Sequence, residues 1–280
     1  MGQSSTPAGR EFAFDDADFA AIRALVKSLT GINLVESKRE LVYGRISRRL
    51  RVLGMYSFRD YLEFLRTDGE QELVEFCNAI TTNLTAFFRE SHHFDYLRDY
   101  LKTLQQSGQR RRLRIWSAGC STGEEPYSIA MTVCEAIPDW SRWDIRILAT
   151  DLDSNVLAHA RRGLYSADRV KALSSERVRK FFQPASNGAG QGFQVAEALQ
   201  RMIAFKELNL IEPLPMKGPL DAIFCRNVII YFDKDTQRDL FRRIAPLQPA
   251  GGLLFLGHSE SLFKVSTDYS LLGKTIYERS

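Results

Sequence analysis

The sequence predicts an α/β protein with a mostly parallel sheet, preceded by a small helical domain. Two observations predict this. Apolar segments of strand length alternate with helix-length amphipathic segments from residue 113 to the C-terminus. Before them, residues 12–89 carry apolar side chains at helical spacing almost throughout. With 280 residues and 44% hydrophobic content, the chain can bury the core that both parts require.

The expected strands and helices of the α/β part follow from this alternation. The predicted strands are 113–117, 145–150, 203–208, 220–225, 253–258 and 275–278, and the predicted helices are 125–136, 154–162 and 235–244. One stretch departs from the alternation, because residues 187–192 are rich in glycine and predict a hairpin turn or loop. We therefore expect a small inserted subdomain at about 174–202.

The domain organisation follows from the same patterns. Residues 1–11 are small and polar and predict a disordered tail, and 12–89 form the helical domain. Glycines 31 and 54 are expected to end helices, while Ser57 and residues 67–69 supply a cap and a turn. Residues 90–112 comprise a linking helix, 92–106, and a polar junction. The α/β domain occupies 113–280.

Composition favours a cytoplasmic protein. No apolar run approaches the roughly 18 residues of a membrane helix, and the first thirty residues lack the pattern of a secretory signal. The four cysteines are widely spaced and form no CxxC pair, so we expect reduced thiols and neither a metal site nor a disulfide framework.

The loop after the first predicted strand carries the strongest chemical signal. Gly119 and Gly123 flank a tight turn between a strand and a helix, which is how a chain builds a nucleotide-shaped pocket. A turn without any ligand is the alternative. Glu124 and Glu125 would repel phosphates, and no phosphate-binding Gly-Lys-Ser/Thr element is present. The residues thus favour a cationic nucleoside without phosphates, which describes S-adenosylmethionine (SAM).

Polar residues follow the other predicted strands as well. Asp151 ends the second strand, where a carboxylate can accept hydrogen bonds from both ribose hydroxyls; its alternative role is a helix N-cap. Asn209 and Arg226 follow the next two strands. Because ligands bind beyond the carboxyl ends of parallel strands, we expect Gly119, Asp151, Asn209 and Arg226 to converge.

Five motifs in order resemble those of the bacterial chemoreceptor methyltransferases, the CheR family. They span residues 82–90, 116–128, 149–153, 221–233 and 257–260. The resemblance runs from about Phe19 to the end of the chain. It implies an N-terminal helical domain, a class I methyltransferase domain with an inserted β-subdomain, and SAM-dependent methylation of receptor glutamates to methyl esters during chemotactic adaptation.

The resemblance also implies individual roles. The cofactor contacts of the family fall on these positions: Asn83, Thr85, Arg89, Glu124, Asp151, Asn209, Leu210, Arg226 and Asn227. We expect Asp151 to hold the ribose, Asn209 and Leu210 to border the adenine, and Arg89 to bind the methionine carboxylate. Gly119 completes the predicted cofactor site. From residues alone, ion pairs for Arg89 and Arg226 and a helix cap for Asn83 would be favoured.

Catalysis is expected to need positioning more than proton transfer. A glutamate carboxylate is ionised at neutral pH, so it needs no general base. Tyr231 matches the tyrosine thought to orient the substrate carboxylate, and a buried structural aromatic is its alternative role. His92 and His93 are neighbours on a helix and should diverge, and His258 should support a turn, so no metal is expected.

A cationic helix face provides the predicted receptor contact. Residues 41–53 combine an apolar stripe with Arg45, Arg48, Arg49 and Arg51, a pattern equally typical of a solvated face. By resemblance, this face meets the glutamate-rich cytoplasmic helical domains of chemoreceptors. The inserted subdomain is a candidate site for a receptor C-terminal peptide. We expect a monomer that binds neither nucleic acid nor the membrane interior.

Two alternatives remain open from the sequence. One is a non-catalytic receptor-binding adaptor that retains the methyltransferase fold, although Asp151, Asn227 and Tyr231 are all present. The other is an enzyme that methylates a small molecule or nucleic acid. The Cys-Arg-Asn-Val run at 225–228 disfavours it, because amide-nitrogen methyltransferases carry Pro-Pro-Tyr.

Overall fold

The computed structural model describes residues 10–67, 69–108, 111–186 and 191–280. The expected disordered tail lies mostly outside the described residues, as do Asp68, part of the polar junction and most of the glycine-rich turn. The chain packs as two units. One comprises the residues up to Thr82 together with Tyr231–Asp233, and the other comprises Asn83–Ile230 and Lys234–Ser280. No helix among the described residues is long and apolar enough to cross a bilayer.

The first unit is helical, as the periodicity predicts. Its helices are α1 (Asp16–Thr30), η1 (Glu36–Lys38), α2 (Arg39–Leu53), α3 (Phe58–Thr67) and α4 (Glu70–Ile80). Gly31 and Gly54 both adopt the left-handed conformation and end α1 and α2. The Ser57 hydroxyl accepts the Asp60 N–H at 3.1 Å, which confirms the expected cap. Buried apolar side chains of all four α-helices form one core.

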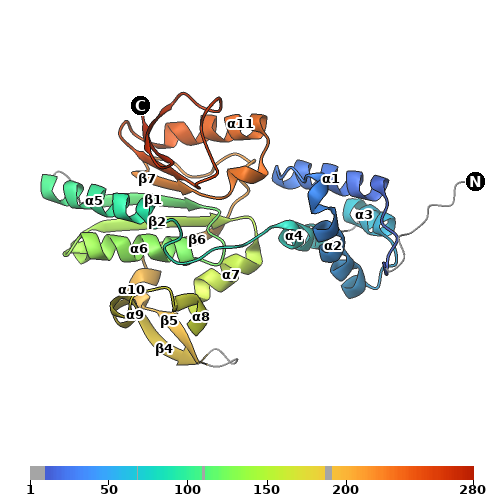
Figure 1. Ribbon diagram of the computed structural model, residues 1–280, viewed down its shortest axis with the longest axis horizontal. Coiled ribbons are helices and arrows are strands. Elements are labelled where there is room, and N and C mark those ends of the chain that lie inside the picture. The colour runs from blue at the N-terminus through green and yellow to red at the C-terminus, as the bar shows by residue number, and fades with distance from the viewer. Residues whose placement is uncertain (1–9, 68, 109–110, 187–190) are drawn as a thin grey trace, which may run out of the picture. The chain divides into compact units, whose positions relative to one another are not determined.

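The second unit is built on a seven-stranded sheet of order β6-β2-β1-β7-β8-β10-β9 (Figure 1). Its strands are β1 (Arg112–Ala118), β2 (Asp144–Asp151), β6 (Ile203–Glu207), β7 (Ala222–Cys225), β8 (Leu253–Leu256), β9 (Tyr269–Gly273) and β10 (Ile276–Arg279). The first five are parallel, and β10 pairs antiparallel with β8 and β9. The mostly parallel sheet is therefore confirmed, while β9 was not predicted.

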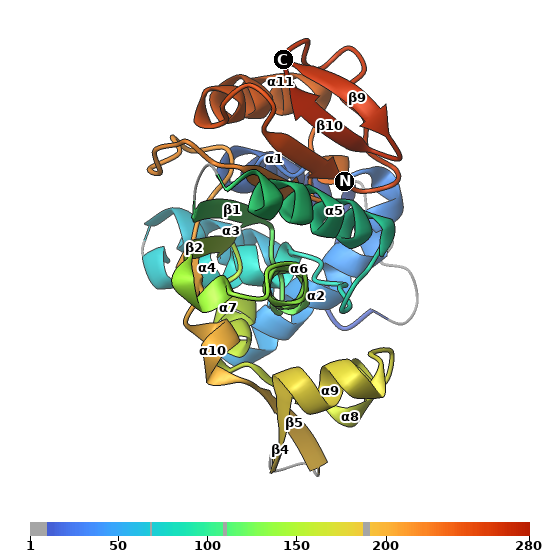
Figure 2. The ribbon, with the colours of Figure 1, turned by 90° about the vertical axis from the view of Figure 1, so that its left-hand side faces the viewer.

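Helices cover this sheet. They are α5 (His92–Ser107), α6 (Glu124–Ala136), α7 (Ser154–Arg162) and α11 (Lys234–Ile244), with short 3-10 turns η2 (Trp140–Arg142), η3 (Ile229–Tyr231) and η4 (Ala245–Leu247). Helices α5 and α6 run side by side in both views (Figure 2). Their buried faces share one core with β1 and β7, which includes Leu97, Ile129 and Phe224.

The inserted subdomain is a three-stranded antiparallel sheet of order β3-β5-β4. It comprises β3 (Leu164–Ser166), β4 (Phe182–Ser186) and β5 (Gln191–Val195), with α8 (Ala167–Val170), α9 (Ser175–Phe181) and α10 (Glu197–Gln200). Strand β3 lies ahead of the expected start at 174. A segment of three residues is too short to show an alternating pattern, so this strand could not be predicted.

Candidate cofactor site

The loops that carry the predicted cofactor residues lie at one edge of the large sheet. Strands β1, β2, β6, β7 and β8 are parallel, so the segments after their carboxyl ends share that edge. The chain passes from β1 to β2 and β6, then crosses to β7 on the other side of β1. This places the topological switch point between β1 and β7, where α/β sheets bind ligands.

The loop from β1 to α6 is as tight as its glycines predict. Gly119 (φ 77°) and Gly123 (φ 97°) both have left-handed backbones. A Cβ on Gly119 would lie 2.3 Å from Cγ2 of Val228, and one on Gly123 would lie 2.8 Å from the Tyr165 hydroxyl. Both positions thus require glycine for conformation and for space.

Glu124 has a cationic partner within the protein. Its side chain is fully buried, and Oε1 lies 3.2 Å from Nη1 of Arg169. The Thr122 hydroxyl donates to Oε2 at 2.6 Å. Arg169 also donates to the Thr85 carbonyl at 3.0 Å, so it links the glycine loop to the segment before α5. Arg169 was not among the predicted site residues, because nothing in its local sequence pattern marks it as a partner of Glu124.

Asp151 is held rigidly at the end of β2. Its carboxylate accepts the N–H groups of Ser121 at 2.8 Å and Asp153 at 3.0 Å. Burial raises the pKa of this carboxyl, and the two backbone N–H groups oppose that shift. The N-cap of α7 is Asp153, whose carboxylate accepts the N–H of Asn155 at 2.9 Å. Asp151 is therefore free of the capping role that was its alternative.

Two predicted site residues, Asn83 and Asn209, make hydrogen bonds within the loops near Asp151. The Asn83 amide donates to Asp153 at 2.6 Å, and its carbonyl accepts the Ser121 hydroxyl at 3.2 Å. After β6, the Asn209 side chain accepts the Ile211 N–H at 3.3 Å, and its carbonyl accepts a bond from Glu212. Leu210 is buried.

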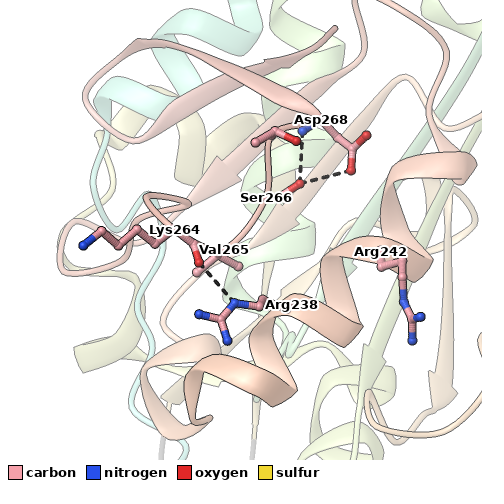
Figure 3. Close-up of a pocket in the computed structure, with 7 residues that line it drawn as sticks. Arg238, Arg242, Lys264, Val265, Ser266 and Asp268 are labelled. Atoms are coloured by element: carbon pink, nitrogen blue, oxygen red, sulfur yellow. Dashed lines mark hydrogen bonds between the residues drawn. The ribbon is translucent and has the colours of Figure 1, made fainter.

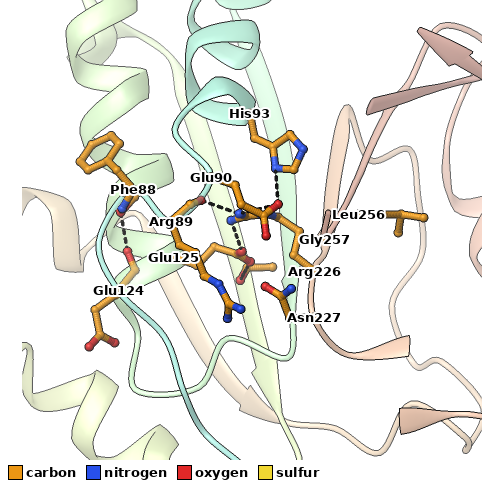
Figure 4. Close-up of polar contacts among 12 residues, drawn as sticks. Phe88, Arg89, Glu90, His93, Glu124, Glu125, Arg226, Asn227, Leu256 and Gly257 are labelled. Carbon is orange, nitrogen blue, oxygen red and sulfur yellow. Dashed lines mark hydrogen bonds and ion pairs between the residues drawn. The ribbon is translucent and has the colours of Figure 1, made fainter. Parts of the chain in front are cut away.

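Arg226 lies at the centre of a buried ionic cluster (Figure 4). Its side chain is 2% exposed, with Nη1 2.9 Å from Oε2 of Glu125 and Nη2 3.3 Å from Oε2 of Glu90. The guanidinium also donates to the Arg89 carbonyl. Burial works to raise the pKa of Glu90, but the charge of Arg226 and the His258 contact lower it to about 2.

Glu260 fixes the loop after β7. Its buried carboxylate accepts backbone N–H groups from Asn227 at 2.8 Å, Val228 at 2.9 Å and Gly257 at 2.6 Å. Asn227 itself has φ 59°, and a Cβ on Gly257 would lie 2.9 Å from its backbone nitrogen. Gly257 and Glu260 belong to one of the five sequence motifs, but the motif itself does not indicate that Glu260 fixes this loop.

The histidines differ from expectation. The rings of His92 and His93 do not diverge, because both Nε2 atoms lie close to the Lys274 carbonyl, at 3.3 and 3.1 Å. With Glu90 they offer ligand atoms within 4.8 Å of one another, yet the Arg226 guanidinium already supplies the positive charge there. His258 contacts the Glu90 carboxylate at 3.1 Å rather than supporting only a turn.

Tyr231 packs with the helical unit. Its carbonyl accepts the Asn33 N–H at 2.7 Å, and the neighbouring Phe232 pairs with Ile32. The α/β domain was expected to occupy residues 113–280 without interruption, but residues 231–233 belong to the helical unit. This long-range pairing has no local sequence signal.

The four arginines of α2 have different environments. Arg45 donates to the carbonyls of Ile80 and Thr81 at 2.6 Å and so caps the end of α4. Arg49 forms a two-bond pair with the buried Glu72, at 2.8 and 2.6 Å, and Arg51 pairs with Glu11 at 2.6 Å. Arg48 is exposed, and no acidic side chain of the described residues pairs with it.

A cavity of about 440 Å³ lies apart from these loops, between α11 and the segment before β9 (Figure 3). Arg238 and Arg242 line it, but each pairs with an aspartate one turn earlier, at 2.6 and 2.9 Å. No predicted site residue lines this cavity.

A parallel sheet with its switch point beside a tight glycine loop is the architecture of the class I SAM-dependent methyltransferases. The CheR methyltransferase SAM binding domain matches residues 83–277, and the CheR methyltransferase all-alpha domain matches residues 17–81. The chain belongs to the CheR methyltransferase family, and the predicted resemblance is confirmed. SAM is the cofactor of that domain.

Curated relatives match nearly the whole chain. Chemotaxis protein methyltransferase 2 of Pseudomonas aeruginosa is 45% identical, over 98% of this chain and 98% of its own length. The chemotaxis protein methyltransferase of Salmonella typhimurium is 42% identical, over 99% of this chain and 98% of its own length. That of Escherichia coli is 42% identical, over 96% and 92%.

Proposed function

We propose that this chain transfers the methyl group of SAM to glutamate side chains on the cytoplasmic helical domains of chemoreceptors. The products are glutamate methyl esters and S-adenosylhomocysteine, and the process is chemotactic adaptation in the cytoplasm. The supporting observation is the full-length similarity to chemotaxis protein methyltransferases together with a complete set of predicted site residues. A degenerate adaptor would be free to lose that set.

The residues at the sheet edge fit SAM. The loop before α6 is tight and has no phosphate-binding Gly-Lys-Ser/Thr element, which suits a nucleoside without phosphates, and Asp151 is anchored by two N–H groups. Asp151 would hold the ribose hydroxyls, Asn209 and Leu210 the adenine, and Arg89 the methionine carboxylate. The other predicted residues would shape the surrounding wall: Asn83, Thr85, Gly119, Glu124, Arg226 and Asn227.

Methyl transfer to an ionised glutamate requires little proton transfer by the protein. Bound SAM supplies an electrophilic methyl group. The substrate glutamate is already ionised at neutral pH, so the protein must align it and exclude water. Tyr231 would donate a hydrogen bond that orients this carboxylate. Charge is lost as ester and thioether form, so a dry site favours the reaction.

Receptor docking would rest chiefly on Arg48 within α2. Its three neighbouring arginines hold internal partners, so they would contribute to the local potential rather than as free side chains. We further propose that the protein acts as a monomer, without nucleic acid or membrane insertion, and that the β3-β5-β4 sheet binds a receptor C-terminal peptide.

Labelled methyl transfer tests the enzymatic function. Receptor-rich membranes are incubated with methyl-labelled SAM and the protein, and then treated with base. A carboxyl methyl ester releases volatile methanol, whereas methylated nitrogen does not. Asp151→Asn is the matched variant, and it should release much less. A folded protein that binds SAM but transfers no base-labile label would support the adaptor instead.

A further inference from the structure

Glu90 joins three segments that are far apart in the sequence. Its carboxylate lies 3.3 Å from Nη2 of Arg226, 3.1 Å from Nδ1 of His258 and 3.6 Å from Nδ1 of His93. The Glu90 side chain is 12% exposed and that of Arg226 is 2% exposed. This carboxylate thus connects the segment before α5 to the loops after β7 and β8.

The backbone around Glu90 is unusual. Phe88 (φ 52°) and Glu90 (φ 56°) both have left-handed conformations, and Arg89 lies between them. Non-glycine residues adopt such angles only when their surroundings hold them there. The Phe88 N–H donates to the Ser128 hydroxyl at 2.9 Å, and the Arg89 carbonyl accepts from Arg226. The Arg226 guanidinium therefore contacts both the side-chain carboxylate of Glu90 and the backbone carbonyl of Arg89.

This arrangement directs the Arg89 side chain. Figure 4 shows Arg89 pointing away from the Glu90 carboxylate and toward the side where Asn227 lies. Its Nη1 donates to the Leu84 carbonyl at 3.0 Å. Phe88 and Glu90, the two left-handed residues that flank Arg89, set the direction of its side chain. The contacts of the Glu90 carboxylate hold the second of these residues in place.

We propose that Glu90 is a positioning residue, which fixes the backbone that presents Arg89 to the carboxylate of SAM. The inference rests on the role proposed above for Arg89. Glu90 would act through Arg226 and the peptide between them, without touching the cofactor. It would therefore affect ligands that carry the amino-acid carboxylate and spare those that lack it.

Calorimetric binding with two ligands tests this role. S-adenosylhomocysteine carries the carboxylate, and 5′-methylthioadenosine keeps the nucleoside and thioether without it. In Glu90→Gln the charge on Arg226 loses one partner, and we expect about tenfold weaker binding of S-adenosylhomocysteine with methylthioadenosine affinity unchanged. Equal weakening of both ligands, or of neither, would overturn the proposal.

Two further variants keep the test decisive. Glu90→Asp retains the charge but shortens the side chain, so it should fold if Glu90→Gln does not, and it should show the same selective loss. Glu72→Gln breaks another Glu–Arg pair, in the helical unit, and should lower the melting temperature without changing either affinity.

A double-mutant cycle identifies Arg89 as the intermediary. If Glu90 acts by placing Arg89, then Glu90→Gln should add little to the loss caused by Arg89→Ala. Full additivity would contradict this route. Failure of the wild-type protein to bind S-adenosylhomocysteine would instead refute the proposed function, so the two failures are distinguishable.

Discussion

Two Arg–Glu pairs, one in each unit, have similar geometry but different settings. Arg49 meets Glu72 at 2.6 Å between α2 and α4, with the arginine 20% exposed. Arg226 meets Glu125 at 2.9 Å and Glu90 at 3.3 Å, and is 2% exposed. The first pair joins two helices, whereas the second joins a helix start to segments without regular structure.

The difference indicates what each pair is for. Helices α2 and α4 also share an apolar core, so the Arg49–Glu72 pair only supplements packing. The segments around Glu90 and Arg226 bear left-handed residues and lack repeating backbone hydrogen bonds of their own. There a buried charge cluster can define the conformation that predicted cofactor residues need.

The largest effect is expected from Arg226→Met. This change leaves Glu90 and Glu125 buried without their cation, which costs about 3–5 kcal/mol in the free energy of unfolding. Urea unfolding of the second unit measures it. A loss below about 1 kcal/mol would show that the cluster is not needed for stability.

Acid should destabilise the Glu90 cluster through His93. Burial is the main reason that the pKa of His93 falls to about 4 from 6.5. Between these values the unfolded chain binds more protons, so stability falls as pH drops through this window. From pH 7 to pH 5 we expect the free energy of unfolding to fall by about 2 kcal/mol, and we expect His93→Gln not to show this loss. Equal pH profiles for both proteins would refute this assignment.

Arg49→Met should have a smaller effect than Arg226→Met. Glu72 would lose its cation but keep the Tyr61 hydroxyl, which donates to it at 2.7 Å. We expect a loss of about 1–2 kcal/mol in the helical unit, measured by urea unfolding. A larger loss than for Arg226→Met would reverse the comparison.

Arg48→Glu should scarcely change stability, because the side chain is exposed and pairs with no described carboxylate. We expect a change within about 0.5 kcal/mol in unfolding and a several-fold slower receptor methylation at low salt. Lys38→Glu, a charge reversal beside the same helix, is the control. If Arg48→Glu left receptor methylation unchanged, the positive charge of α2 would have no role in receptor docking.

Much of the fold could be predicted from local pattern. Strands β1 and β2 and helices α6 and α7 lie within a residue of expectation, because their apolar periodicity is strong. Strand β9 could not be predicted, since most of its side chains are exposed and show no alternation. Strand β3 is too short to carry a pattern.

The placement of the strand-end residues could be predicted from the sequence, but their side-chain partners could not. Parallel strands bring Gly119, Asp151 and Arg226 to one edge, which the alternation implies. The ion pairs of Arg226 and Glu124 and the convergence of the histidines depend on residues more than forty positions away. Such pairings are set by tertiary packing, and the local sequence pattern does not indicate them.

A crystal structure with S-adenosylhomocysteine bound tests the central claim most directly. We predict the ribose hydroxyls on Asp151, the adenine beside Asn209 and Leu210, and the carboxylate on the Arg89 guanidinium, with Glu90 still paired to Arg226. A ligand bound away from the carboxyl edge of β1 and β2, or one that leaves Asp151 uncontacted, would contradict it.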